Sequence, residues 1–197
     1  MAKDERMEAE RRKALSMLRS YTLADLFTLA NASCGTLAIF LCLGYLSDDR
    51  KAEIWAAFLL TVAALVFDVL DGYVARLSKR RQSVLGADLD SLADIVSFGV
   101  APAVLGYTLG LRGFWDVTCL TFFVCCGISR LARFNVTSAT LTNASTGKVR
   151  YFEGTPIPSS VILVLAMAVL YGLGRTGDEF LLGKAHFLGR VFHPFSL

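Results

Sequence analysis

Residues 67–94 read FDVLDGYVARLSKRRQSVLGADLDSLAD, and this stretch decides the fold. Four of its aspartates, Asp68, Asp71, Asp90 and Asp94, lie in largely apolar segments on the two sides of a short basic connector. An ionised aspartate at membrane depth costs on the order of 2.5–3.5 kcal/mol on insertion scales, so it needs a partner or a watery cavity. The stretch therefore predicts two membrane helices that meet at a shared polar site.

The aspartates are spaced in helical register. Asp68 and Asp71 lie three residues apart, and Asp90 and Asp94 lie four apart. Residues at these spacings share one face of an α-helix, so each pair projects from a single face. The alternative is that the aspartates cap helices and form ion pairs with nearby basic residues. Helix stability, however, does not require so much buried like charge.

Small residues and one arginine accompany the aspartates. Gly72 and Ala75 follow Asp71, and Gly86 lies one helical turn before the second aspartate pair, where it leaves a ligand room to approach the backbone. Arg76 borders the acidic cluster with a guanidinium group that suits bidentate binding of phosphate. The pattern predicts a site for a phosphate-bearing ligand.

The predicted cofactor is a divalent metal, because carboxylates that face one another repel unless a cation lies between them. Ligation by oxygen alone, without a convergent histidine or cysteine, favours magnesium, manganese or calcium over zinc. A phosphate-bearing substrate favours the first two of these metals. Since two ions suit phosphoryl chemistry, we expect two Mg²⁺ or Mn²⁺ ions at the four aspartates.

The whole chain predicts an all-α, polytopic bundle of transmembrane helices. Of its 197 residues, 54% are hydrophobic and 19% are charged, and the mean hydropathy is +0.53. One water-soluble core could not bury so much apolar surface. Apolar stretches of about 18 or more residues predict spans over residues 23–46, 54–77, 83–111, 114–135 and 156–173. Pro102 should bend the third span, and residues 193–197 resemble the start of a truncated sixth.

Residues 1–21 are predicted to form an amphipathic helix on the membrane surface, ahead of a single membrane domain that covers residues 22–197. A frayed polar tail is the alternative for this segment. Basic residues in short connections prefer the cytoplasm, which places the amino terminus and the basic residues 79–81 on that side. We therefore expect a multi-pass protein of the cell membrane whose site faces the cytoplasm. The mild net charge of +3 predicts no nucleic-acid partner.

The quoted stretch resembles the motif of the CDP-alcohol phosphotransferase family, which is DxxDGxxAR, a spacer and then GxxxDxxxD. The resemblance implies that Asp68, Asp71 and Asp90 bind metal, and that Asp94 both contacts metal and acts as the catalytic general base. It also implies contacts with CDP-diacylglycerol from Thr28, Asn31, Asp68, Gly72, Ala75, Arg76, Ser83 and Gly86.

Three later stretches are most like the membrane-embedded phosphatidylserine synthases of that family: SFGVAP at 97–102, SRLARFN at 129–135 and FEGTPIP at 152–158. This resemblance implies transfer of the phosphatidyl group from CDP-diacylglycerol to the hydroxyl of L-serine, with release of CMP. The protein would work in membrane lipid and could form a homodimer. Arg130 and Arg133, three residues apart, could clamp the serine carboxylate or a phosphate, and Glu153 could meet the serine ammonium group.

Several alternatives stay open at this point. Glycerol 3-phosphate or an inositol phosphate could replace serine as the acceptor, since the arginines could bind a dianion. The arginines could instead extend to lipid headgroups. A metal-ion or proton transporter would also use intramembrane carboxylates, but we would expect it to scatter them over several spans rather than gather them in residues 68–94.

Overall fold

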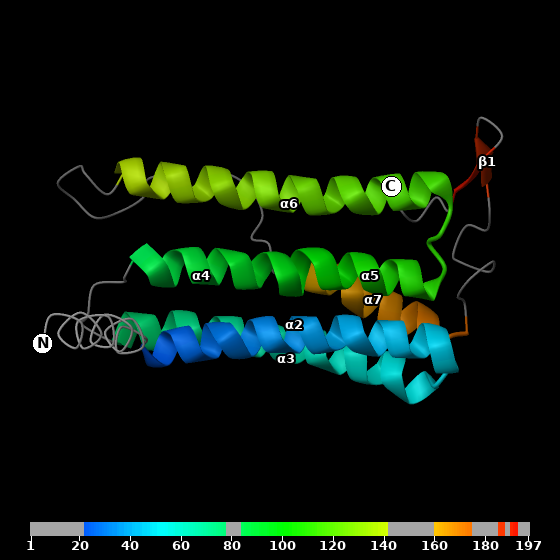
Figure 1. Cartoon of the computed structure of the whole chain (residues 1–197), viewed down its shortest axis with the longest axis horizontal. Coiled ribbons are helices and arrows are strands. Elements are labelled where there is room, and N and C mark those ends of the chain that lie inside the picture. Colours follow the sequence, from blue (N-terminus) through cyan, green and yellow to red (C-terminus); the bar gives the residue numbers. More distant parts are fainter. Residues whose placement is uncertain (1–21, 78–83, 142–159, 175–184, 188–189, 193–197) are drawn as a thin grey trace, which may run out of the picture.

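The computed structural model describes residues 22–77, 84–141, 160–174, 185–187 and 190–192. Its elements in chain order are α2 (Leu23–Asp48), α3 (Lys51–Leu77), α4 (Val84–Asp94), the π-helix η1 (Ile95–Val100), α5 (Ala101–Leu109), α6 (Phe114–Leu141), α7 (Ser160–Gly172), β1 (Ala185–Phe187) and β2 (Arg190–Phe192). The long helices lie side by side along one axis, with α4 and α5 between α2 and α6 (Figure 1).

Four helices are long and apolar enough to cross a membrane: Leu23–Asp48, Lys51–Ala75, Gly86–Leu109 and Phe114–Val136. They confirm the predicted all-α, multi-pass architecture. The fifth predicted span is shorter than expected, because α7 has 13 residues. A helix of that length rises about 20 Å, whereas the hydrocarbon core is roughly 30 Å thick. The described chain thus has four long spans and one shorter apolar helix in place of five long spans.

The remaining predictions concern the two ends of the chain, where an amphipathic helix and a truncated sixth span were expected. Residues 1–21 and 193–197 lie outside the described residues, so the amphipathic helix and the truncated sixth span stay predictions. Strands β1 and β2 pair in antiparallel register, with Ala185 opposite Phe192 and Phe187 opposite Arg190. This hairpin was not predicted, because three-residue strands carry too little alternation to be recognised in a sequence.

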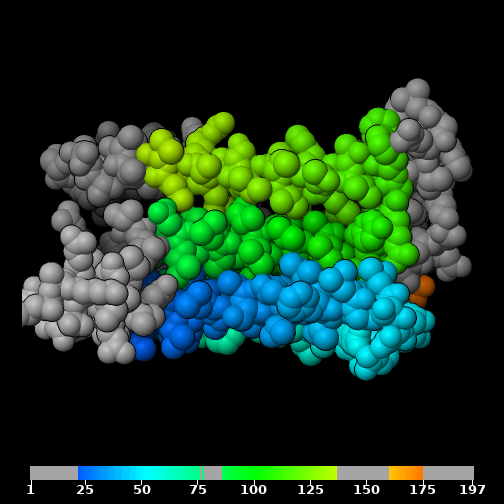
Figure 2. All heavy atoms as spheres, in the orientation of Figure 1, coloured from blue at the N-terminus to red at the C-terminus, as the bar shows by residue number. Residues whose placement is uncertain are grey.

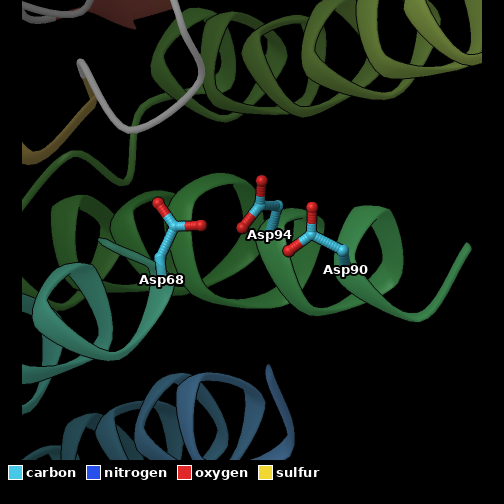
Figure 3. A group of neighbouring side chains, drawn as sticks. All are labelled: Asp68, Asp90 and Asp94. Carbon is cyan, nitrogen blue, oxygen red and sulfur yellow. The ribbon is translucent and has the colours of Figure 1, made fainter. Parts of the chain in front are cut away.

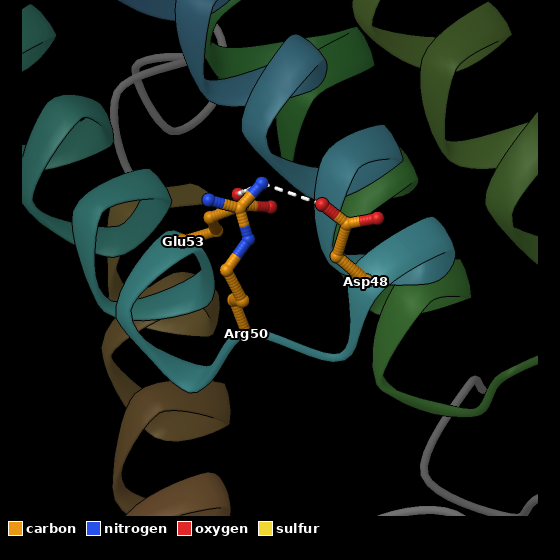
Figure 4. A network of polar contacts seen from close by, with 3 residues as sticks. All are labelled: Asp48, Arg50 and Glu53. Carbon is orange, nitrogen blue, oxygen red and sulfur yellow. Dashed lines mark hydrogen bonds and ion pairs between the residues drawn. The ribbon is translucent and has the colours of Figure 1, made fainter.

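Local polar contacts set both ends of α2. Thr22 caps its start: the Asp25 amide donates to Thr22 Oγ1 at 3.3 Å, and the Thr22 amide donates to Asp25 Oδ2 at 2.7 Å. This reciprocal pair satisfies two amides that the first helical turn leaves free. At the other end, Arg50 forms ion pairs with both Asp48 and Glu53 in the tight connection to α3 (Figure 4). The connection holds α2 and α3 as an antiparallel pair.

The third predicted span is interrupted by a π-helical segment. Ile95–Val100 lies between α4 and α5, and the Ala101 amide donates to the Val96 carbonyl, five residues back. Pro102 has no N–H to donate, and its ring crowds the carbonyl four residues before it. Wider i→i+5 turns accommodate such a residue. The structure thus has a change of helical register in the turns that precede Pro102, and the bend itself stays a prediction.

Apolar packing joins the helices, and among the described residues α6 contributes to it only through the partly buried Leu120. One core cluster includes Ile54, Phe58, Leu105 and Met167, all less than 5% exposed, and so links α3, α5 and α7. By contrast, no residue of the most apolar 18-residue window of α6 is buried within the described structure. Helix α6 forms one edge of the molecule, beside the surface of α4 and α5 (Figure 2). In a membrane, most of this helix would contact lipid.

Candidate active site

Three aspartates from two helices converge on one point. Asp68 on α3 and Asp90 and Asp94 on α4 each offer a carboxylate oxygen, and these oxygens all lie within 4.8 Å of one another. Figure 3 shows the Asp68 carboxylate turned toward the other two across the gap between the helices. Because Asp90 and Asp94 are one helical turn apart, they present their carboxylates side by side, as their spacing predicted.

Asp71, the fourth aspartate of the motif, is not a member of this group. Its side chain is buried, at 7% exposure, and its Oδ2 accepts a hydrogen bond from Thr28 Oγ1 at 2.9 Å. The Thr28 hydroxyl also lies 3.2 Å from the Ala24 carbonyl oxygen in its own helix. The structure thus tethers Asp71 to α2, and its predicted role as a metal ligand stays a prediction.

Asn31 places a second side chain of α2 against the acidic group. It is fully buried, and its Nδ2 donates to Asp94 Oδ1 at 3.3 Å. Its backbone carbonyl accepts from Ser97 Oγ, in the π-helix, at 2.9 Å. Thr28 and Asn31, which were predicted to approach the nucleotide, therefore both contact aspartates of the motif in this structure.

Two oxygen atoms at this site are buried without a hydrogen-bond partner among the described residues. They are Asp90 Oδ1 and Asn31 Oδ1. A buried acceptor without a donor is costly, and an ordered ion can satisfy such a group. The aspartate cluster offers oxygen ligands alone, which is the chemistry that Mg²⁺ and Mn²⁺ prefer. The residues present fit a divalent cation.

The structure describes only some of the other residues that were predicted to contact CDP-diacylglycerol. Gly72 and Ala75 lie in α3 after Asp71, and Gly86 lies one turn before Asp90; all three are partly exposed. Arg76 belongs to α3, but its side chain is not among the described ones. Ser83, together with Glu153 from the predicted acceptor set, lies outside the described residues.

The two predicted acceptor arginines lie on α6. Arg130 is partly buried and Arg133 is exposed, and neither forms an ion pair with another residue of the described part of the chain. A further contact, which the sequence did not predict, connects α6 with α4, the helix that carries Asp90 and Asp94. Asn135 Nδ2 on α6 donates to Ser91 Oγ on α4 at 2.9 Å. The only sequence signal for it was that Ser91 directly follows Asp90 and that Asn135 ends the SRLARFN stretch.

Known proteins resemble the chain over most of its length. The sequence model of the CDP-alcohol phosphatidyltransferase family matches residues 21–194. A CDP-diacylglycerol–serine O-phosphatidyltransferase of Saccharomyces cerevisiae is 45% identical over 165 residues, which make up 83% of this chain and 59% of the relative. An archaetidylserine synthase of Methanothermobacter thermautotrophicus is 39% identical over 144 residues, covering 72% of this chain and 55% of the relative.

A third relative, a CDP-diacylglycerol–serine O-phosphatidyltransferase of Helicobacter pylori, is 37% identical over 155 residues, which make up 76% of this chain and 58% of the relative. The chain thus spans somewhat more than half of the length of these curated relatives. No solved structure matches it. The match across residues 21–194, which includes the whole aspartate motif, confirms the resemblance found in the sequence: the chain belongs to the CDP-alcohol phosphatidyltransferase family.

Proposed function

We propose that this chain transfers a phosphatidyl group from CDP-diacylglycerol to L-serine, forming phosphatidylserine and CMP in phospholipid biosynthesis. The observation that carries the proposal is the convergence of Asp68, Asp90 and Asp94 within 4.8 Å across two helices. The names of the three relatives supply the acceptor, because each of them includes serine. A transporter is a weaker alternative, since the carboxylates gather at one point instead of marking a path through several spans.

We propose that the aspartates hold two divalent metal ions, either Mg²⁺ or Mn²⁺. Asp68, Asp90 and Asp94 are placed to share one ion, and Asp71 would join them at the side of the site nearest α2. When bound, the metal supplies positive charge that neutralises the diphosphate of the donor and stabilises the departing CMP. Without that charge, three carboxylates so close together would repel one another.

Asp94 is the proposed general base. Asn31 Nδ2 holds its Oδ1 at 3.3 Å, and no described residue forms a hydrogen bond with its Oδ2. The serine hydroxyl would give its proton to Asp94 as its oxygen attacks the phosphorus that carries diacylglycerol. The bond between that phosphorus and the oxygen of CMP then breaks, and CMP leaves. Asn31 would keep the carboxylate turned in the orientation that this proton transfer needs.

CDP-diacylglycerol would lie between α2 and the two helices that carry the motif aspartates, α3 and α4, with its acyl chains in lipid. We assign the nucleotide and diphosphate contacts to residues 28, 31, 68, 72, 75, 76, 83 and 86, as the family motif implies. Thr28 and Asn31 support this assignment, because both already lie against motif aspartates. Buried Asn31 Oδ1, which has no partner among the described residues, is available to accept a hydrogen bond from a ligand.

Serine would bind on the side of the site that faces α6. Arg130 is the better placed of the two arginines, because it is partly buried whereas Arg133 is exposed. Its guanidinium could pair with the serine carboxylate, and Glu153 would receive the ammonium group. The apolar outer face of α6 would contact lipid or, in a homodimer, a second copy of the chain.

The chain is a multi-pass membrane protein, and we propose that it lies in the cell membrane with the aspartate site facing the cytoplasm. The aspartates lie near the end of the bundle where α3 ends and α4 begins. In the sequence, the basic residues 79–81 come shortly after the last residue of α3, Leu77. Short basic connections prefer the cytoplasmic side, which supports this orientation.

A purified-protein assay tests the proposed reaction. The chain in detergent micelles receives CDP-diacylglycerol with Mg²⁺ or Mn²⁺, and serine, glycerol 3-phosphate and inositol phosphate are added in separate reactions. We expect CMP release and phosphatidylserine formation with serine alone, and neither after chelation of the metal. Product from glycerol 3-phosphate but not from serine would reject serine as the acceptor. CMP release without any acceptor would show hydrolysis instead of transfer.

A further inference from the structure

A pair of hydrogen-bonded side chains, Ser91 on α4 and Asn135 on α6, joins these two helices beside the aspartate cluster; we call it the polar bridge. The Ser91 hydroxyl donates to the Ala87 carbonyl one turn back at 3.1 Å and accepts from Asn135 Nδ2 at 2.9 Å. A hydroxyl has one proton and two lone pairs, so it can serve both partners at once. The Ser91 side chain is therefore committed to α4 on one side and to α6 on the other.

The bridge lies on the flank of the acidic face. Ser91 directly follows Asp90 and precedes Asp94 by three residues, so it projects roughly 60° around α4 from Asp94 at about 100° per residue. Whatever contacts Ser91 is thus a close neighbour of the aspartates without being directed at them. Asn135 is partly buried, whereas the residues that flank it, Phe134 and Val136, are exposed.

Among the described residues, few other contacts hold α6 near the site. The most apolar part of the helix has no buried residue, so side-chain packing gives it a weak hold on the described bundle. Interhelical hydrogen bonds from asparagine are one of the forces that associate helices in a membrane, where burial of apolar surface is not available. A single bridge can therefore decide the rotation of α6 at this end.

That rotation matters because α6 carries Arg130 and Arg133. Counted from Asn135, Arg133 lies roughly 160° around the helix and Arg130 roughly 140° on the other side. With Asn135 directed at α4, Arg130 is partly buried and Arg133 remains exposed. The two arginines therefore lie about 60° apart on the helix, and a turn of α6 would change the surroundings of both together.

We propose that Asn135 is a positioning residue for the acceptor: through Ser91 it fixes the rotation of α6 and so places Arg130 for serine. The inference rests on the proposed function, since it assigns Asn135 to the acceptor side of that reaction. It separates the two substrates, because the described residues assigned to CDP-diacylglycerol lie on α2, α3 and α4. Loss of the bridge should weaken serine binding and leave CDP-diacylglycerol binding intact.

The first test measures the KM for each substrate in Asn135→Ala, Ser91→Ala and the double variant. We expect each single variant to raise the KM for serine about 3- to 18-fold, the range that interhelical hydrogen bonds in membranes span, with the KM for CDP-diacylglycerol unchanged. The double variant should be no worse than either single one, because both remove the same interaction. Thr121→Ala is the matched control, since Thr121 on α6 donates only to its own helix, at Val117.

Other outcomes overturn the inference. If Asn135→Ala impairs serine use and Ser91→Ala does not, Asn135 contacts the substrate itself and is not a positioning residue. If both substrates lose affinity equally, the bridge supports the whole fold and not the acceptor side.

The second test needs no catalysis and so separates this inference from the proposed function. Hydrogen–deuterium exchange of residues 127–141 should increase in both single variants, with no further increase in the double variant, and should stay at the wild-type level in Thr121→Ala. If the wild-type chain makes no phosphatidylserine, the proposed function fails while this measurement still reports on the bridge. Unchanged exchange in Asn135→Ala and Ser91→Ala would refute the bridge itself.

Discussion

Replacing Gly35 with alanine should disturb the site from a distance, because α2 touches the π-helix there. A Cβ at position 35 would lie 2.5 Å from Ser97 Oγ and 2.7 Å from Ser97 Cα. The second atom is backbone, so a change of rotamer cannot relieve the clash. Moving the Ser97 backbone from 2.7 Å to 3.4 Å, where ordinary contact begins, requires α2 and η1 to separate by about 0.7 Å.

The same separation would lengthen two hydrogen bonds that Asn31 makes. If the 3.3 Å bond from Asn31 Nδ2 to Asp94 lengthened by that amount, it would reach about 4.0 Å, beyond hydrogen-bonding distance. Overpacking costs about 1–3 kcal/mol, and the better helix propensity of alanine offsets about 1 kcal/mol of that. With the weakened bonds included, we expect a net loss of about 1–2 kcal/mol, which lowers the unfolding midpoint by about 2–8 °C.

The assay compares Gly35→Ala with Gly99→Ala, which adds the same methyl group inside the π-helix where nothing lies within 4 Å of the new Cβ. We expect Gly99→Ala to keep the wild-type midpoint and rate of CMP release, and Gly35→Ala to lower both. Adding Ser97→Gly to Gly35→Ala should restore stability only in part, since the clash with the backbone at position 97 remains. A Gly35→Ala protein as stable and active as Gly99→Ala would refute the close approach of the two helices and with it the role given to Asn31.

Three other predictions concern the acidic site. Asp94→Asn should lower turnover by about 10²- to 10⁴-fold while CDP-diacylglycerol still binds, and a wild-type rate would remove Asp94 as the base. Thr28→Val, which deletes the donor to Asp71 at nearly constant volume, should slow CMP release about 3- to 18-fold. Thr36→Val should have little effect, because Thr36 donates only to the Ala32 carbonyl of its own helix. Asp68→Ala should weaken Mn²⁺ binding measured by electron paramagnetic resonance, and equal affinity in the two proteins would exclude Asp68 as a ligand.

The sequence predicted the features of this site that depend on one helix at a time. The spacing of Asp90 and Asp94 placed both carboxylates on one face of α4, and the structure has them there. The first span was predicted to begin at residue 23, and α2 begins there, directly after its N-cap Thr22. The residue type and its local neighbours are sufficient for such inferences.

Contacts between helices could not be predicted in the same way. Nothing in the sequence shows that Thr28 meets Asp71 or that Asn135 meets Ser91, because these pairs depend on the rotation of each helix and on which helices are neighbours. The π-helix was missed for a related reason. Pro102 indicates a disturbance, but whether the chain bends or widens a turn depends on what packs against it, and here Ser97 packs against Gly35.

One face of α2 determines how the acidic helices are spaced, although α2 adds no carboxylate to the metal-binding group. Thr28, Asn31 and Gly35 lie three and four residues apart and so form one stripe along the helix. Along that stripe, Thr28 binds Asp71 on α3, Asn31 binds Asp94 at the end of α4, and Gly35 admits Ser97 of the π-helix. The aspartate motif therefore supplies the ligands, whereas the distance between them depends on a helix outside the motif. It follows that a change on this stripe should alter metal affinity even when all four aspartates are intact.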